Sequence, residues 1–269
     1  MVNFLFWNIH RQPLGEVIAQ LVAEHDVDVL MLAECGIDPL ELVADLNDHV
    51  DEDFFFLKSQ LCERILIFSK FGDLSHAVLF ESDRWTIRRL RLYGGEEILL
   101  VVAHLYSKRH ADAYDQLKEC ESLMQAIRGV EQELGHARTL VAGDFNLGPF
   151  EDGMTRSNGM NAVMSRAIAE RKSRTVDGRQ YDFFYNPMWG LLGDGSPGPP
   201  GTCYYASSRH TMYWYQFDQV LVRPDLLDRF DHRDIRVLTE YRATSLLGRH
   251  GTPNASKYSD HLPLFFRLC

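Results

Sequence analysis

A polar pair follows one of the most apolar segments of the chain. Residues 139–149 read TLVAGDFNLGP, an apolar strand that stops at Gly143. Asp144 and Asn146 come next, and in extended geometry their side chains point to the same side. Asp and Asn are poor strand formers, so their position needs an explanation. An Asx turn that caps the strand is one explanation, and a site that binds a metal ion or substrate is the other.

Other apolar segments end at, or carry, residues of the same kind: Asn8, Glu34, His104, Asp218, Asp260 and His261. Taken singly, each has an ordinary explanation, such as a salt bridge or a satisfied histidine. Together they suggest that distant segments converge at one edge of a sheet. Carboxylate and amide oxygens are the ligands that Mg²⁺ or Mn²⁺ prefers. Such ions neutralise phosphate charge during phosphodiester cleavage, and a carboxylate-held His stabilises the transition state or moves a proton.

Hydrophobic periodicity predicts the elements that position these residues. A strand–helix–strand unit covers residues 3–33, and a long amphipathic helix covers 111–134. Further helices are expected at 38–47 and 159–170. Further strands are expected at 54–57, 64–69, 75–80, 85–92, 97–104, 139–143, 213–222, 235–238 and 262–268, with irregular loops at 186–201 and 242–258.

Length and composition set outer limits. With 269 residues and no visible linker, we expect one domain over residues 1–269. No apolar run approaches the roughly 20 residues of a membrane span. The five cysteines are odd in number and scattered, which is typical of reduced thiols in a cytoplasmic protein and argues against a disulfide framework or a zinc knuckle.

Charge is unevenly distributed along the chain. The net charge of −10 discourages general adhesion to nucleic acid, and residues 12–57 carry twelve acidic residues but no Lys or Arg. Residues 164–180 are instead mainly basic. An acidic site that collects metal ions beside a basic rim would suit a substrate that bears phosphate. The basic run is equally compatible with a solvated helix face.

The ordered set of short motifs resembles the endonuclease/exonuclease/phosphatase superfamily of metal-dependent phosphodiesterases, which includes pancreatic deoxyribonuclease. GDFN or SDH alone would be weak, but the set spans nearly the whole chain in the order of the superfamily. The matching motifs are WNI (Asn8), LAE (Glu34), AHLYS (His104), GDFN (Asp144, Asn146), FDQVLV (Asp218) and SDHLPL (Asp260, His261). The resemblance implies an α/β fold, a four-layered α/β sandwich of two facing mixed, largely antiparallel sheets flanked by helices.

The resemblance also implies a role for each motif residue. The metal ligands would be Asn8, Glu34, Asp144 and Asp260, for one or two Mg²⁺ or Mn²⁺ ions. The catalytic residues would be His104, Asp144, Asn146, Asp218 and His261, with Asp144 activating the attacking water and Asp218 orienting His261. The substrate-binding residues would be Asn8, His104, Asn146 and His261.

Four positions matter for comparison with the superfamily. His104 stands where abasic endonucleases have Tyr and pancreatic deoxyribonuclease has a His paired with a Glu. Glu63 resembles that partner, but it is equally compatible with a surface position. Ala33 replaces the Gln that commonly precedes the metal-binding Glu. Gln219 stands where several nucleases have Arg, which weakens the case for a DNA-backbone contact there.

We therefore expect a Mg²⁺- or Mn²⁺-dependent phosphoric ester hydrolase, a nuclease acting on DNA or RNA by in-line attack of an activated water. The aromatic residues at 189 and 204–214 are compatible with base stacking and with core packing. One alternative is a phosphatase or phosphodiesterase for a small phosphorylated metabolite or lipid head group. The other is a catalytically silent binding module of the same fold.

Overall fold

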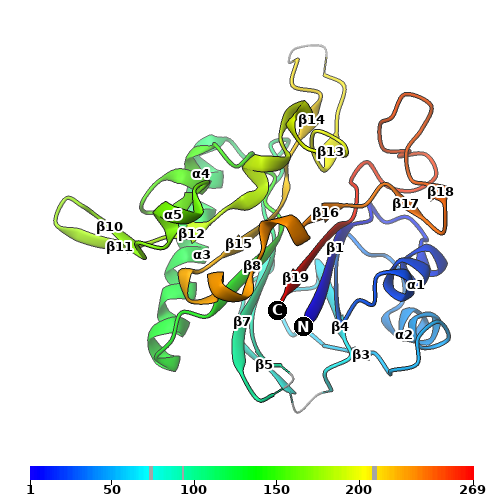
Figure 1. The fold of residues 1–269 in the computed structure, drawn as a ribbon, viewed down its shortest axis with the longest axis horizontal. Helices are drawn as coiled ribbons and strands as arrows, with labels where there is room; N and C mark the ends of the chain where they lie inside the picture. The colour runs from blue at the N-terminus through cyan, green and yellow to red at the C-terminus, as the bar shows by residue number, and fades with distance from the viewer. Residues whose placement is uncertain (73–74, 93, 208–210) are drawn as a thin grey trace.

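Two large β-sheets face each other, and helices cover their outer surfaces (Figure 1). The computed structural model describes residues 1–72, 75–92, 94–207 and 211–269. The four-layered α/β sandwich predicted from the sequence is confirmed. Among the described residues, no helix is both long and apolar enough to cross a membrane.

The first sheet has the N-terminal strand near its centre. Its order is β16 (Arg236–Val237), β19 (Leu264–Leu268), β1 (Val2–Asn8), β2 (Val29–Ala33), β4 (Ile65–Ser69) and β3 (Phe55–Phe56). Strand β1 is parallel to β2 and antiparallel to β19, so the two ends of the chain lie side by side. Helices α1 (Gly15–Glu24) and α2 (Pro39–Asn47) lie on the outer face.

The second sheet contains the strands that carry most of the predicted site. Its order is β5 (His76–Glu81), β6 (Trp85–Arg91), β7 (Glu97–His104), β8 (Thr139–Asp144), β15 (Asp218–Val222), β12 (Phe184–Tyr185) and β9 (Ala162–Val163). Helix α3 (Ala113–Leu134) covers its outer face. Asp112 caps this helix in a capping box, and Gly135 ends it in the left-handed conformation.

Alternation along the strands separates three apolar layers, because successive side chains point to opposite faces. In β1, Phe4 and Phe6 face the second sheet, whereas Leu5 and Trp7 face α1 and α2. The strands around β8 alternate in the same way between the central layer and α3. Both faces of each sheet are therefore buried, which fixes the strand register.

Shorter elements make up the surface segments. They are α4 (Asp152–Thr155), α5 (Arg166–Ala169), the hairpin β10 (Ser173–Val176) with β11 (Arg179–Asp182), η2 (Pro187–Leu191), η3 (Gly193–Gly195), β13 (Cys203–Tyr204), β14 (Trp214–Tyr215), η4 (Pro224–Arg229), η5 (His232–Asp234), β17 (Glu240–Tyr241) and β18 (Thr244–Ser245). Of the basic run, only Arg166 lies in a helix, whereas Arg174 and Arg179 lie in a projecting hairpin (Figure 1), so its interpretation as a helix face is wrong.

Two predicted elements differ from the structure. The helix expected at 159–170 is wrong, because β9 pairs with β12 and only α5 is helical. Asn161 causes this: its φ is 49°, and its amide donates to the carbonyls of Tyr181 and Asp182. The strand expected at 213–222 is divided into β14 and β15, because the chain changes partner from β13 to β8.

Candidate active site

Strand register alone brings three predicted site residues to one edge of the second sheet. His104 lies opposite Asp144 in the β7–β8 ladder, and Asp144 lies opposite Asp218 in the β8–β15 ladder. In the facing sheet, β1 pairs with β2 so that Asn8 lies opposite Ala33, directly before Glu34. The two sheets therefore present these residues at the same end of the sandwich.

The backbone at this edge is tightly constrained. At Gly143, a Cβ would lie 2.0 Å from the carbonyl oxygen of Ala103, so only glycine allows β8 to approach β7 this closely. Glu34 and Asn146 adopt left-handed φ values of 49° and 51°. Such values are uncommon outside glycine and concentrate at functional sites. They turn the chain sharply at the point where each polar side chain leaves its strand.

Asp144 is held from two sides and is only 2% exposed at its side chain. The Asn146 backbone N–H donates to its Oδ1 at 2.9 Å, and the Asn8 amide donates to its Oδ2 at 3.0 Å. The same Asn8 amide lies 3.4 Å from Glu34 Oε1. Asn8 Oδ1 accepts the His10 backbone N–H at 3.0 Å. Asn8 thus bridges the two carboxylates through its nitrogen while its oxygen fixes the following turn.

Asp218 and His261 form a buried pair. The His261 Nδ1–H donates to Asp218 Oδ2 at 2.8 Å, and His261 Nε2 lies 4.0 Å from Asp144 Oδ2. Burial opposes the charged imidazolium, but the negative charge of Asp218 and the hydrogen bond to it outweigh burial and raise the pKa of His261 well above its ordinary value. Strand β1 fixes the pair in place, because Trp7 Nε1 donates to the His261 carbonyl at 2.9 Å.

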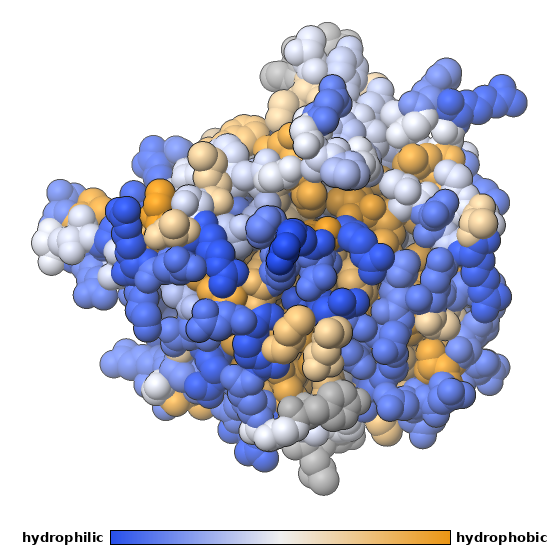
Figure 2. Space-filling model, in the orientation of Figure 1, coloured by the Kyte–Doolittle hydropathy of each residue, from blue (hydrophilic) through white to orange (hydrophobic). Residues whose placement is uncertain are grey.

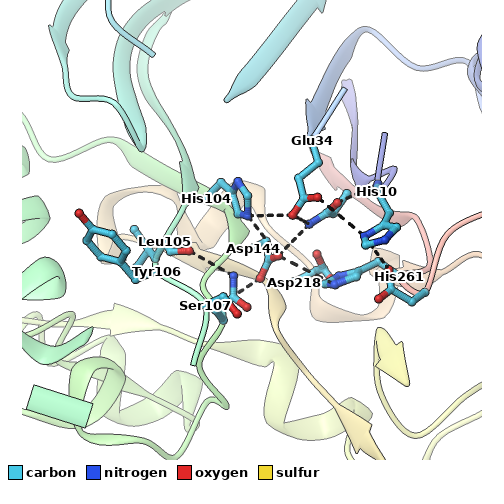
Figure 3. A network of polar contacts seen from close by, with 12 residues as sticks. His10, Glu34, His104, Leu105, Tyr106, Ser107, Asp144, Asp218 and His261 are labelled. Atoms are coloured by element: carbon cyan, nitrogen blue, oxygen red, sulfur yellow. Dashed lines mark hydrogen bonds and ion pairs between the residues drawn. The ribbon is translucent and has the colours of Figure 1, made fainter. Parts of the chain in front are cut away.

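His104 faces two carboxylates. Its Nε2 lies 3.5 Å from Glu34 Oε1 and 3.8 Å from Asp144 Oδ2 (Figure 3). Its buried Nδ1 has no hydrogen-bond partner among the described residues. Glu63, which resembled the partner of this histidine, is exposed. The carboxylates beside His104 are therefore those of the predicted metal site.

Asn146 contributes mainly through its backbone. Its side-chain amide donates to the Leu105 carbonyl at 3.1 Å, and its own carbonyl accepts from Gln116 of α3 at 3.1 Å. These bonds join the β7 and β8 loops to the helix behind them. They hold the Asn146 N–H in place under Asp144.

The structure adds two residues that the sequence did not single out. His10 Nδ1 lies 3.8 Å from Glu34 Oε2 and 3.7 Å from Asp260 Oδ1. Cys203 offers a ligand atom within 4.8 Å of both Asp260 and His261, although burial raises the pKa of its thiol. No sequence motif predicts that either residue lies at the site. The position of His10 depends on a left-handed turn, and that of Cys203 depends on an isolated bridge to His261.

The charge balance of this region is strongly negative. The four carboxylates of the site are Glu34, Asp144, Asp218 and Asp260. In the described part of the chain, no Lys or Arg forms an ion pair with them, and the basic side chains within 4.0 Å of them are histidines. Asp218 Oδ1 is buried without a partner. Ligand atoms of Asp144, Asp218 and His261 lie within 4.8 Å of one another. An oxygen-rich donor set with unbalanced charge suits a divalent cation such as Mg²⁺ or Mn²⁺.

Solved structures of other proteins resemble the fold described above. Similar solved structures include an AP endonuclease from Archaeoglobus fulgidus (16% identity, 100% of this chain and 99% of that chain, TM-score 0.58). Truncated TDP2 from Caenorhabditis elegans is similar at 18% identity, over 99% and 97% of the two chains, with a TM-score of 0.58. A 3′ phosphatase from Neisseria bound to a product DNA hairpin is similar at 14% identity, over 100% of both chains, with a TM-score of 0.55.

At these identities the solved structures establish the fold alone. No curated protein matches the sequence. The model of the endonuclease/exonuclease/phosphatase family matches residues 5–261, which include every polar strand end described above. The chain therefore belongs to the endonuclease/exonuclease/phosphatase family.

Proposed function

We propose that this protein is a divalent-metal-dependent phosphodiesterase that hydrolyses phosphodiester bonds of nucleic acid. The observation that carries the proposal is the convergence of four carboxylates that have no Lys or Arg partner among the described residues. Such a concentration of charge is costly unless a cation completes it. The buried Asp218–His261 pair beside it supplies a group that can donate a hydrogen bond to a phosphate oxygen.

One or two ions of Mg²⁺ or Mn²⁺ suit the donor set. Glu34, Asp144 and Asp260 would hold an ion through carboxylate oxygens, and Asn8 would do so through the lone pair of its Oδ1 that the His10 N–H does not use. Side chains of Glu34 and Asp260 are about one third exposed, at 32% and 35%, so the ion and substrate reach them from solvent. When bound, the ion would neutralise phosphate charge and lower the pKa of a coordinated water.

Asp144 is the candidate base. The Asn146 N–H and the Asn8 amide fix its carboxylate, so an attacking water would meet an acceptor that does not need to reorient. A positioned carboxylate can accept the water proton as the oxygen attacks phosphorus. Because one face of the group is anchored by two hydrogen bonds, the remaining lone pairs are available to the water.

His261 and His104 are the candidate phosphate-binding groups. Asp218 holds His261 through Nδ1, which leaves Nε2 facing the site and able to donate to a phosphate oxygen. His104, at the end of β7, directs Nε2 toward Glu34 and Asp144 in the same region. The second side-chain N–H of Asn146, besides the one donated to Leu105, would supply a further hydrogen bond to phosphate. The Asn8 amide N–H groups are instead directed at Glu34 and Asp144. Stabilising charge that develops on the phosphate oxygens is the main task of such donors.

A nucleic-acid substrate is supported by the aromatic segment above the site. In Figure 1, the β13–β14 hairpin projects beyond the end of the sheets. Tyr205 and Tyr213 are 53% and 42% exposed, and the Arg109 guanidinium lies 5.8 Å from the Tyr205 ring centroid. Exposed rings beside a cation can stack bases and attract the backbone. Residues 208–210 of the predicted stacking segment 204–214 lie outside the described residues.

Anchoring places this aromatic hairpin next to the catalytic groups. Tyr204 N donates to the Asp260 carbonyl at 3.2 Å, and Cys203 bridges to His261. Trp189, the other predicted aromatic, instead packs its ring against Phe150 at 6.1 Å. Structural neighbours that act on DNA, such as the 3′ phosphatase bound to its product hairpin, support the same substrate class.

Cleavage assays test this proposal. The substrates are labelled single-stranded DNA, duplex DNA, RNA and bis-p-nitrophenyl phosphate, each with Mg²⁺, Mn²⁺ or EDTA. Wild type is compared with Asp144→Ala and with Asp194→Ala, a control in the exposed η3 loop. We expect metal-dependent cleavage of a nucleic acid that only Asp144→Ala abolishes. Cleavage of the small ester alone would contradict the substrate class, and no cleavage despite metal binding would indicate a binding module.

A further inference from the structure

His10 lies between two of the proposed metal-binding carboxylates, Glu34 and Asp260, although no sequence motif predicts this position. It follows Asn8 by two residues, where β1 ends and the chain turns with left-handed φ values of 48° at His10 and 56° at Arg11. The turn is held by backbone hydrogen bonds, since the His10 N–H donates to Asn8 Oδ1 and the Arg11 N–H donates to the Glu34 carbonyl at 2.8 Å. A fixed backbone therefore directs the imidazole toward the site.

The imidazole is aimed at the carboxylates without being hydrogen-bonded to them. His10 Nδ1 lies 3.8 Å from Glu34 Oε2 and 3.7 Å from Asp260 Oδ1, both beyond normal hydrogen-bond length. Two ligands of one ion are separated by at most about 4.2 Å when each lies roughly 2.1 Å from it. Both distances are thus compatible with ligand atoms around a shared cation.

Figure 3 shows that His10 and His104 approach the Glu34 carboxylate from opposite sides. The two differ in environment, since the His10 side chain is 56% exposed and that of His104 is 8% exposed. An ion arriving from solvent therefore meets His10 together with the two most exposed carboxylates of the site. His104 lies deeper, beside Asp144.

We propose that His10 Nδ1 is a ligand of the cation held by Glu34 and Asp260, and that this nitrogen makes the site prefer Mn²⁺ over Mg²⁺. The inference rests on the proposed metal-dependent function. Mg²⁺ strongly favours oxygen ligands and retains several waters, whereas first-row transition ions accept imidazole readily. Replacing one oxygen ligand by imidazole therefore changes the relative affinities of the two ions.

A different role for the same histidine predicts the opposite result. An imidazolium between two carboxylates would act as a counter-ion in the metal-free protein, and an arriving cation would have to displace it. Removing a counter-ion tightens binding of Mn²⁺ and Mg²⁺ alike. Removing a ligand weakens binding, and does so more for the ion that favours nitrogen.

Calorimetric titration of the full chain with Mn²⁺ and with Mg²⁺ separates these roles. His10→Gly removes the imidazole and keeps the left-handed backbone without strain. We expect it to weaken Mn²⁺ binding by about tenfold or more and Mg²⁺ binding by less than about threefold. His10→Asp, which restores an oxygen ligand, is expected to tighten Mg²⁺ binding and to narrow the difference between the ions.

His232→Ala is a matched control. Its side chain is 58% exposed and lies 3.7 Å from Asp231, closely resembling the surroundings of His10. His232 lies in η5, close to the Asp234–Arg267 ion pair. Arg267 lies opposite Asn3 in the strand pair, at the end of β1 that is distant from Asn8 and the site. Affinity for either ion should remain unchanged in this variant.

A second readout does not depend on affinity. Electron spin echo spectroscopy of bound Mn²⁺ is expected to show nitrogen modulation that falls in His10→Gly and persists in His232→Ala. Unchanged or tighter Mn²⁺ binding in His10→Gly would overturn the role of His10 while leaving the proposed hydrolase intact. If wild type bound neither ion, the proposed metal-dependent function would be overturned as well.

Discussion

Two buried polar networks lie at opposite ends of the same pair of strands, and they are built on opposite principles. Strands β8 and β15 pair so that Asp144 lies opposite Asp218 at one end, whereas Leu140 lies opposite Val222 at the other. The first end carries the candidate active site. The second carries an ion pair between Arg223, directly after β15, and Glu131 of α3.

The network at the Arg223 end is closed. Arg223 Nε and Nη2 donate to the two Glu131 oxygens at 2.9 Å each, and its Nη1 donates to the carbonyls of Asp182 and Phe183 at 3.0 Å. Thr139 donates to Glu131 at 2.6 Å. The charges are matched one to one and the donors are used, as a buried ion pair requires.

The network at the active end is open. Carboxylates predominate there, and the basic groups beside them are histidines. Asp218 Oδ1 and His104 Nδ1 are buried without partners among the described residues. Most of the molecular face drawn in Figure 2 is hydrophilic. Unpaired buried polar atoms are uncommon in native proteins and each requires a reason. The comparison teaches that buried charge by itself does not identify a functional site, whereas incompletely matched charge does.

Substitution at the open network should affect activity far more than stability. Asp144→Asn keeps the size of the side chain and removes its charge. We expect hydrolysis to fall by about a thousandfold, because the candidate base is lost. The free energy of unfolding should change by less than about 1 kcal/mol, because the substitution also removes unbalanced charge. Steady-state kinetics measures the loss of activity, and urea unfolding measures the change in stability. A large loss of stability together with the loss of activity would contradict the prediction that this network serves function rather than folding.

Substitution at the closed network should have the reverse effect. Arg223→Met leaves Glu131 buried and unpaired, so we expect a loss of about 3–5 kcal/mol in the free energy of unfolding. The turnover number per folded molecule should be unchanged below the unfolding transition. The double variant Arg223→Met/Glu131→Leu should recover much of the stability, because two apolar groups replace the ion pair. Urea unfolding without that recovery would show that packing, rather than charge matching, dominates there.

Glu119 is intermediate between the two networks, because its buried carboxyl accepts one hydrogen bond but has no cation within hydrogen-bond distance in the described part of the chain. Its side chain is 8% exposed, Tyr106 N donates to it at 2.8 Å, and Arg84 Nε remains 3.7 Å away. Burial raises the pKa of Glu119 to about 7, against the lowering effects of the Tyr106 hydrogen bond and Arg84. The folded state then holds a proton that the unfolded state releases, so stability is greatest below the ordinary Glu pKa and falls as pH rises through about 7.

We expect this carboxyl to lower the free energy of unfolding by about 2 kcal/mol between pH 4.5 and pH 7.5. Glu119→Gln removes the titration, so the unfolding free energy of the variant should depend less steeply on pH by that amount. Urea unfolding of both proteins across the range measures the difference. Parallel pH profiles for wild type and variant would refute the prediction.

Tyr205 lies outside both networks and should affect substrate binding alone. Tyr205→Ala removes an exposed ring, and we expect it to weaken binding of single-stranded DNA by about five- to tenfold, or about 1 kcal/mol. Tyr205→Phe should bind as wild type does, because stacking needs the ring and not the hydroxyl. Fluorescence anisotropy measures both. Equal hydrolysis of bis-p-nitrophenyl phosphate by all three proteins would show that the catalytic groups are intact.

Sequence predicted the parts of the site that depend on strand ends. An apolar strand that stops at Asp144, Glu34 or His104 can be recognised within its own short segment of sequence. Strand pairing then brings these residues together. The fold class was predicted from the resemblance of the ordered motifs to the superfamily. The sequence did not predict that His10 and Cys203 lie at the site. The position of His10 depends on a left-handed turn, and that of Cys203 depends on a contact between distant segments.

The ion pair of the closed network was not predicted from sequence for a related reason. Glu131 and Arg223 are 92 residues apart, and each resembles a surface residue in its own segment. The helix expected at 159–170 failed because tertiary hydrogen bonds of Asn161 override local helical periodicity. The roles of the individual site residues and the single-domain organisation stay predictions.

Unfolding in the presence of Mn²⁺ tests most directly whether the open network is completed by a cation. Wild type and Glu34→Gln/Asp260→Asn would be unfolded by heat in EDTA and in rising Mn²⁺. We predict that Mn²⁺ stabilises wild type by about 2.7 kcal/mol at a hundred times its dissociation constant. We also predict that the double variant is already more stable in EDTA and gains little from the ion. Equal stabilisation of both proteins, or of neither, would contradict the account.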